Sequence, residues 1–190
     1  MIAIDHTHLP VYRVIRRGWT DPLDSSFSRS QSDNRWNTAD FPALYCCCSE
    51  PVARAVTLDI FRFAGIELTD LHPQARPQLA EIRWQGRVAN MASPEGIQAA
   101  GFPANYPAEV SKRQTREYAA AWYQAEMEGV VCRSASLFRQ GLRHWVEPHQ
   151  RWSELAIFPQ PSATLPSLIR RRDDLDWLIR SDVSYSPNAE

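Results

Sequence analysis

The chain of 190 residues contains almost no lysine: among its 21 lysine and arginine residues, Lys112 is the only lysine. The planar guanidinium of arginine binds phosphate and carboxylate groups through two hydrogen bonds at once, although a bias in genome composition explains the same excess equally well. Positive and negative charges nearly cancel, and the net charge is −1. We therefore expect no general attraction to nucleic acid or to an anionic membrane.

Long apolar segments are also absent. No run approaches the roughly 18 residues that cross a membrane, and no charged and then apolar leader precedes the first predicted strand. The sequence contains no internal repeat and no second-domain boundary. It therefore predicts a cytoplasmic protein with a single domain over residues 1–190, long enough to bury about 70% of its unfolded surface.

Metal-binding and hydrolase motifs are missing as well. The cysteines at 46–48 are consecutive, lack the C-x₂-C spacing of a zinc site, and lie apart from Cys132. We interpret all four as small apolar core residues of a protein in a reducing compartment. His144 and His149 are five residues apart and miss a common helix face, so we expect no metal. The chain has no G-x-S-x-G motif, which argues against a hydrolase triad.

Short apolar runs and helical patterns do not alternate regularly along the chain. We expect strands at 9–17, 41–48, 78–84, 130–135 and 154–158, and helices at 50–64, 94–100, 111–128 and 173–180. The helix at 111–128 is marked by a stripe of Tyr118, Ala121, Trp122 and Ala125 and is expected to close at Gly129. The irregular order predicts an α+β fold with twisted mixed β-sheets and packed helices, rather than a doubly wound fold.

The most informative stretch, residues 34–59, joins a long polar loop to a strand and a helix. The loop ends in an arginine and tryptophan pair, Arg35 and Trp36, and loops of this length are usually functional or disordered. The strand that follows carries Tyr45 to the start of a helix, with Ser49 as its N-cap. An arginine, an aromatic ring and a helix N-terminus indicate a site for a phosphate and a ring.

Four motifs occur in the order and at roughly the spacing of the RES domain family: V-Y-R-V (11–14), N-R-W-N (34–37), L-Y (44–45) and G-V-V-C-R-S-A (129–135). The chain resembles this family over about residues 9–160, which leaves 161–190 as a C-terminal extension. Its members resemble ADP-ribosyltransferase folds, and several are toxins that degrade NAD⁺ and are neutralised by a helix-turn-helix antitoxin. The resemblance implies that NAD⁺ is the substrate here and that an antitoxin protein is the partner.

The resemblance also assigns roles to individual residues. For catalysis it implies Arg13, Tyr45, Ser134 and Asp59, and for substrate binding Arg35, Trp36 and Asn37. The two arginines would hold phosphates, the tyrosine would stack on a ring, and the serine would bond a polar edge of the ligand. Taken alone, the residues leave structural roles open, with Arg13 paired to an internal carboxylate and Tyr45 in the core.

One residue of the family pattern is missing. The family's glutamate, expected early in the helix after the strand, falls at Val56 or Thr57. Asp59 lies about one turn further along, on the stripe of Val56 and Phe63, and an acid in an apolar stripe is either paired or functional. Asp59 either replaces the glutamate in an active NAD⁺ glycohydrolase, phosphorylase or ADP-ribosyltransferase, or it pairs with Arg13. In the second case the domain is a degenerate module that binds nucleotides or proteins.

The C-terminal part carries a run of arginines, Arg170 to Arg172, followed by Asp173, Asp174 and Asp176. These charges nearly cancel locally, so we expect a solvated surface that pairs with itself. A nucleic-acid enzyme is disfavoured because the chain lacks a basic stripe. The sequence does not decide whether water, phosphate or a protein accepts the ADP-ribose.

Overall fold

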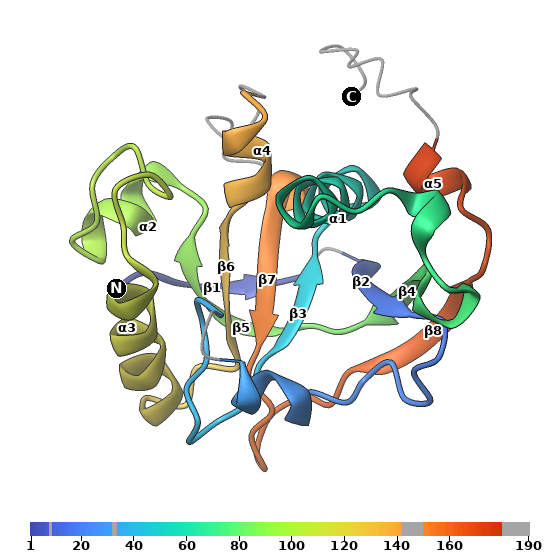
Figure 1. Ribbon diagram of the computed structural model, residues 1–190. Coiled ribbons are helices and arrows are strands. Elements are labelled where there is room, and N and C mark those ends of the chain that lie inside the picture. The colour runs from blue at the N-terminus through green and yellow to red at the C-terminus, as the bar shows by residue number, and fades with distance from the viewer. Residues whose placement is uncertain (8, 32–33, 142–149, 180–190) are drawn as a thin grey trace.

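The computed structural model describes residues 1–7, 9–31, 34–141 and 150–179 (Figure 1). Its centre is one sheet of eight strands in the order β1-β5-β6-β7-β3-β2-β4-β8. The strands are β1 Ala3–His6, β2 Val11–Arg16, β3 Leu44–Cys47, β4 Pro77–Arg83, β5 Gly86–Met91, β6 Gly129–Arg133, β7 Ser153–Ile157 and β8 Ser167–Arg172. Neighbouring strands are antiparallel except for the parallel pair β5 and β6. The mixed sheet and its helices form the α+β fold that the sequence predicts.

Two groups of helices cover one face of this sheet. The helices are α1 Glu50–Ala64, α2 Pro94–Ala99, α3 Lys112–Gln124, α4 Ala135–Arg139 and α5 Asp176–Ile179. Figure 1 shows α2 and α3 over one end of the sheet and α1, α4 and α5 over the other. On β3, Tyr45 packs against the apolar cluster under α2 and α3, and Cys47 belongs to the cluster under α1 and α4. Since alternate residues of a strand share a face, both clusters lie on the same side of the sheet.

The opposite face forms a core mostly from the strands themselves. Val11 and Ile15 of β2 meet Leu44 of β3 and Ile82 of β4 there, and Trp19 of the following loop packs over them. The helices therefore serve only one face, and any site beside them must lie on that face.

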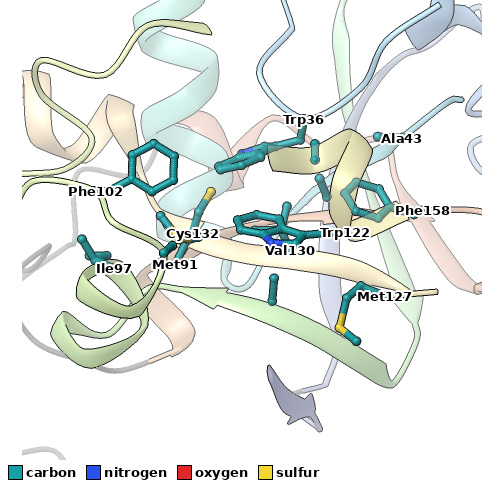
Figure 2. Packing of buried hydrophobic residues seen from close by; sticks show 14 of the residues in the cluster. Trp36, Ala43, Met91, Ile97, Phe102, Trp122, Met127, Val130, Cys132 and Phe158 are labelled. Atoms are coloured by element: carbon teal, nitrogen blue, oxygen red, sulfur yellow. The ribbon is translucent and has the colours of Figure 1, made fainter. Parts of the chain in front are cut away.

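The cluster under α2 and α3 is rich in aromatic residues. Trp36 of the loop before β3 stacks on Trp122 of α3, with ring centroids 5.7 Å apart and the planes 24° apart (Figure 2). Phe41 stacks on Tyr123 at 4.4 Å and meets Phe158 edge to face. These contacts attach both ends of the 36–41 segment to α3 and to the end of β7.

The predicted helix at 50–64 is confirmed, because α1 spans these residues and ends at Gly65 with a left-handed φ of 62°. Ser49 occupies the N-cap, but its side chain makes no capping hydrogen bond. The helix predicted at 111–128 begins as expected, with Ser111 accepting from the backbone of Gln114. It ends at Gln124 rather than at Gly129, which begins β6.

The predicted helix stripe is wrong in part. In α3 the buried residues are Thr115, Ala119 and Trp122, whereas Ala121 and Ala125 are exposed. The strands β1, β5 and β8 and the short helix α4 were not predicted, because their residues are polar or broken by glycine. Sheet pairing, rather than local pattern, stabilises such segments.

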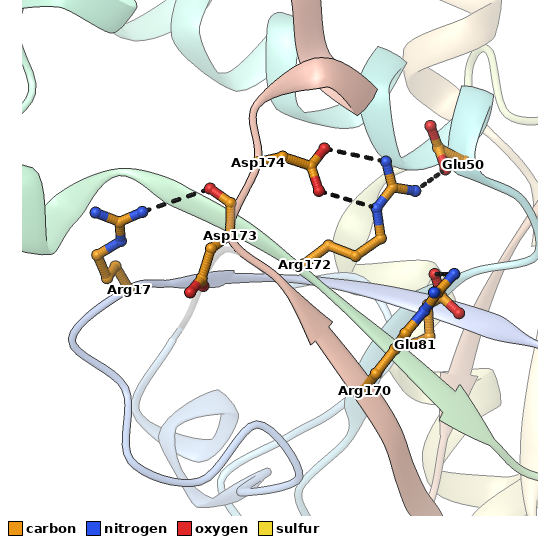
Figure 3. Close-up of polar contacts among 7 residues, drawn as sticks. All are labelled: Arg17, Glu50, Glu81, Arg170, Arg172, Asp173 and Asp174. Atoms are coloured by element: carbon orange, nitrogen blue, oxygen red, sulfur yellow. Dashed lines mark hydrogen bonds and ion pairs between the residues drawn. The ribbon is translucent and has the colours of Figure 1, made fainter.

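The arginine run at 170–172 is not a solvated surface that pairs only with itself. It forms part of β8, and Arg170 pairs with Glu81 of β4 at 2.8 Å (Figure 3). Arg172 contacts both Asp174 and Glu50 at the start of α1. The expectation failed because the strand alternation points Arg170 and Arg172 at carboxylates far away in the sequence. The edge strand is thereby attached to the sheet and to α1.

No helix within the described part of the chain is both long enough and apolar enough to cross a membrane.

The aromatic cluster supports a stability prediction with a matched control. Phe41→Ala should lower the free energy of unfolding by about 3–5 kcal/mol, because it leaves a cavity between Tyr123 and Phe158. Phe27→Ala should change it by less than about 1 kcal/mol, since Phe27 is 55% exposed. Urea denaturation of the two variants measures the difference, and equal losses would show that Phe41 is not a core anchor.

Candidate functional site

Polar side chains gather on the helix-covered face, between the two apolar clusters. In the sheet, Cys47 of β3 and Cys132 of β6 both pair with Glu154 of β7, and Tyr45 pairs with Ala156. Tyr45 and Glu154 are therefore diagonal neighbours on adjacent strands and face the same side. A glutamate on the central strand of this face is the first element of a site.

Ser134 holds this glutamate from the end of the neighbouring strand. It follows β6, is fully buried and caps α4, where its Oγ accepts from the backbone N–H of Leu137 at 3.3 Å. The same hydroxyl donates to the Glu154 Oε1 at 2.7 Å. The Ser134 hydroxyl thus binds a carboxylate of the protein, and it can act on a ligand only through that carboxylate.

Burial raises the pKa of Glu154 above the ordinary value of a glutamate. The hydrogen bond from Ser134 and the charges of Arg35 and Arg139 act in the opposite direction and lower it, but burial dominates. The residue nevertheless keeps part of its surface accessible. Glu154 is therefore a proton-binding group that solvent or a ligand can reach.

Arg35 lies in the loop that crosses above this face. Its Nη1 is buried and has no hydrogen-bond partner among the residues that the structure describes, and its charge acts on both Glu154 and Tyr106. A buried guanidinium N–H without a partner is costly unless a ligand or water satisfies it. The role of Arg35 in binding phosphates stays a prediction.

Tyr45 fixes the loop that carries Arg35. Its hydroxyl accepts from the backbone N–H of Trp36 at 2.8 Å and donates to the Asn37 Oδ1 at 2.9 Å. Burial raises the pKa of this phenol, so it stays protonated as a donor. Tyr45 as a whole is half-buried.

Trp36 and Asn37 are placed differently from the sequence prediction. Trp36 is 2% exposed and stacks on Trp122 in the core, so its ring cannot meet a ligand. Asn37 is 1% exposed, and its side-chain amide donates to the carbonyl oxygen of Ser28 at 2.7 Å. The predicted binding roles of these two side chains are wrong as direct contacts, because both are used to hold the loop.

Arg13 is also separated from this group. It lies on β2 between Val11 and Ile15, which belong to the core on the opposite face of the sheet. Its Nη1 donates to the carbonyl oxygen of Pro22 at 2.7 Å, and its guanidinium lies over the ring of Trp19. The structure therefore does not bring Arg13 together with Tyr45 and Ser134.

Asp59 is paired, but not with Arg13. Its carboxylate accepts from the Nε of Arg139 at 2.9 Å and also contacts the Nη2 of the same side chain. Asp59 is 4% exposed, whereas Phe63, one turn further along α1, is 72% exposed. The proposed Arg13 partnership is wrong. Asp59 instead joins α1 to α4, whose Arg139 also acts on Glu154.

A cavity of about 500 Å³ opens on the other side of Asn37, between the loop and α3. Three of its lining residues are arginines, namely Arg29, Arg113 and Arg116. The charge of Arg116 also lowers the pKa of Tyr45, although burial of the phenol outweighs it. Glu117 also lines the cavity and pairs with Arg113, so Arg29 and Arg116 supply its excess positive charge.

The profile of the RES domain family matches residues 10–178. The chain belongs to the RES domain family. Among curated proteins, no sequence matches it. A chain in the crystal structure of the M. tuberculosis MbcT–MbcA toxin–antitoxin complex has the same fold, with a TM-score of 0.66 and 18% identity over 86% of this chain and 82% of that chain.

Val56 and Thr57, which stand where the RES family has its glutamate, carry no carboxylate. Val56 is half-buried, and Thr57 is 3% exposed with its Oγ1 donating to the Ala53 carbonyl at 2.8 Å. Among the described residues, no three His, Cys, Asp or Glu side chains form a group that could hold a metal ion. His144 and His149 lie outside the described residues.

Sequence reasoning missed Glu154 and Arg139. Of these, Glu154 left a signal: it is an acid in a predicted strand, 154–158, that is otherwise apolar. A carboxylate in such a run is either paired or functional. Arg139 gave no such signal, because only the packing of α4 on α1 brings it to Asp59.

The hydroxyl of Tyr45 should contribute measurably to stability. Tyr45→Phe leaves the Trp36 N–H and the Asn37 Oδ1 without their partner, which should cost about 1–3 kcal/mol. Tyr118→Phe is the matched control, because Tyr118 lies in the same cluster and its hydroxyl makes no hydrogen bond within the described ranges. Chemical denaturation measures both, and a silent Tyr45→Phe would contradict the loop-anchoring role.

The pair of Asp59 and Arg139 can be tested by a double-mutant cycle. With Asp59→Asn, Arg139→Gln and the double variant, we expect a coupling energy of about 1–2 kcal/mol, reduced because Arg139 is 40% exposed. The same cycle on Arg113 and Glu117, an exposed pair within α3, should give only about 0.3–0.5 kcal/mol. Equal couplings would show that burial adds nothing to the first pair.

Proposed function

We propose that this RES domain protein is a toxin that degrades NAD⁺ at the bond between nicotinamide and ribose. The observation that carries the proposal is the Nη1 of Arg35, which is buried without a hydrogen-bond partner among the described residues, next to Trp36, whose backbone Tyr45 binds. Arginine forms strong, charge-assisted hydrogen bonds with phosphate oxygens. An unsatisfied arginine next to an aromatic ring is the arrangement that a dinucleotide requires.

In this proposal the diphosphate binds Arg35 and the arginines of the adjoining cavity, Arg29 and Arg116. The ring of Tyr45 stacks on nicotinamide or its ribose. Ser134 acts through Glu154, to which it donates its only hydroxyl proton. Trp36 and Asn37 hold the loop in place and do not touch the ligand.

The toxin role also predicts a protein partner. The similar fold from M. tuberculosis comes from a toxin–antitoxin complex, and we propose an antitoxin protein with a helix-turn-helix domain as the partner here. Since NAD⁺ is a cytoplasmic metabolite, the proposal places the protein in the cytoplasm. The acceptor of the ADP-ribose is water, inorganic phosphate or a protein.

The direct test is the release of nicotinamide from NAD⁺ by the purified chain, with water, phosphate or a protein as the acceptor. Arg35→Gln should weaken NAD⁺ binding about 10–100-fold, because one charged hydrogen bond contributes about 1.5–3 kcal/mol. Arg62→Gln, an exposed arginine at the end of α1, is the control and should leave binding unchanged.

A second candidate function is a degenerate RES domain that binds a nucleotide without cleaving it. The lack of a carboxylate at Val56 and Thr57 favours this candidate. Calorimetric binding of NAD⁺ with no nicotinamide release for any of the three acceptors would select it. Absence of both binding and release would exclude the enzyme and the nucleotide-binding module together.

A further inference from the structure

We infer that Glu154 supplies, from β7, the carboxylate that this RES domain lacks on α1. The inference rests on the proposed function and adds to it the residue that bears the negative charge at the reacting ribose. The assignment of this role to Asp59, which the sequence suggested, is the competing hypothesis. The hydrogen-bond partners and the positions of Glu154 and Asp59 distinguish the two hypotheses.

The first distinction is how each carboxylate is occupied. The Asp59 carboxylate is taken up by two nitrogens of Arg139. Glu154 accepts a hydrogen bond from the Ser134 hydroxyl at 2.7 Å. Within the described part of the chain, it forms no ion pair with any arginine or lysine. Its negative charge therefore remains available to a cationic ligand group.

The second distinction is position. Glu154 lies on the same face as Tyr45, one diagonal away on the neighbouring strand. Arg35 lies close enough for its charge to lower the pKa of Glu154. A ligand whose phosphates bind Arg35 and whose ring meets Tyr45 thus passes over this carboxylate. Asp59 lies on α1, behind Arg139.

The chemistry needs an anion at this place. When the bond between ribose C1′ and the nicotinamide nitrogen breaks, its electron pair leaves with nicotinamide, and the ribose becomes an oxocarbenium-like cation. An ionised Glu154 stabilises this cation through its charge. When water is the acceptor, the water oxygen then bonds to C1′ of the ribose. One proton of this water passes to Glu154 and from there to solvent.

Other ionisable groups face Glu154 within the described part of the chain. The charges of Arg35 and Arg139 act on it from the loop and from α4. Burial raises the pKa of Cys132 to about 12 and raises the pKa values of Cys47, Tyr45 and Tyr106 above their ordinary values. Burial thus disfavours ionisation of these thiols and phenols, so the ionisation of Glu154 can be followed separately.

This raised pKa gives two opposite pH dependences. Because the folded state binds the proton of Glu154 more tightly than the unfolded state, its contribution to stability is present at low pH and is lost as pH rises through the folded pKa. Nicotinamide release, which needs the ionised form, should rise over the same pH range. A purely structural Glu154 would give the stability trend alone.

The test compares wild type, Glu154→Gln, Asp59→Asn and the exposed control Glu67→Gln in NAD⁺ binding, nicotinamide release and thermal unfolding between pH 5 and 8. Glu154→Gln should keep NAD⁺ binding within a few-fold and slow release by about 10²–10³-fold. It should also abolish both pH dependences. Asp59→Asn should lose stability but keep the wild-type pH profile of release, and Glu67→Gln should match wild type.

A second variant keeps the test decisive if Glu154→Gln does not fold. Ser134→Ala removes the hydrogen bond that lowers the pKa of Glu154, so the midpoint of the release profile should move to higher pH. Release by Glu154→Gln at the wild-type rate, or an unmoved midpoint in Ser134→Ala, would overturn the inference and leave the proposed function standing. A wild type that neither binds nor cleaves NAD⁺ would overturn both.

Discussion

The candidate site depends on the way one loop is attached to the helix-covered face of the sheet. The ring of Trp36 is buried against Trp122, and the hydroxyl of Tyr45 bonds both the Trp36 N–H and the Asn37 side chain. These contacts leave little freedom for Arg35, which directly precedes Trp36 in the loop. Its guanidinium is thereby held over the central strands. Because the loop is already ordered before binding, a ligand that binds Arg35 loses little entropy in ordering the loop.

The division of the apolar core sets where polar groups are tolerated. Two clusters serve two separate groups of helices on the same face, and between them the sheet carries Glu154 instead of an apolar residue. A carboxylate there destabilises the folded state when it is ionised, which is the meaning of its raised pKa. Such a cost is typical of functional positions, where local stability is exchanged for chemistry.

The carboxylates of Asp59 on α1 and Glu154 on β7 have different electrostatic surroundings. Asp59 faces Arg139 directly, so the pair is neutral and joins α1 to α4. Glu154 is surrounded by a hydroxyl, thiols and more distant guanidinium groups. In our proposal, this difference is what lets Glu154 on a strand supply the negative charge that Val56 and Thr57 on the helix do not provide.

The sequence by itself determined the family, the α+β class and the bounds of α1, because these follow from local patterns and short motifs. It did not determine that Arg13 faces away, since strand alternation assigns faces only once the pairing of β2 is known. Nor did it assign Trp36 and Asn37 to structural roles, or pair Asp59 with Arg139, 80 residues away. Those contacts, and the meeting of Ser134 with Glu154, arise only when distant strands and helices pack together, so the tertiary structure alone decided them.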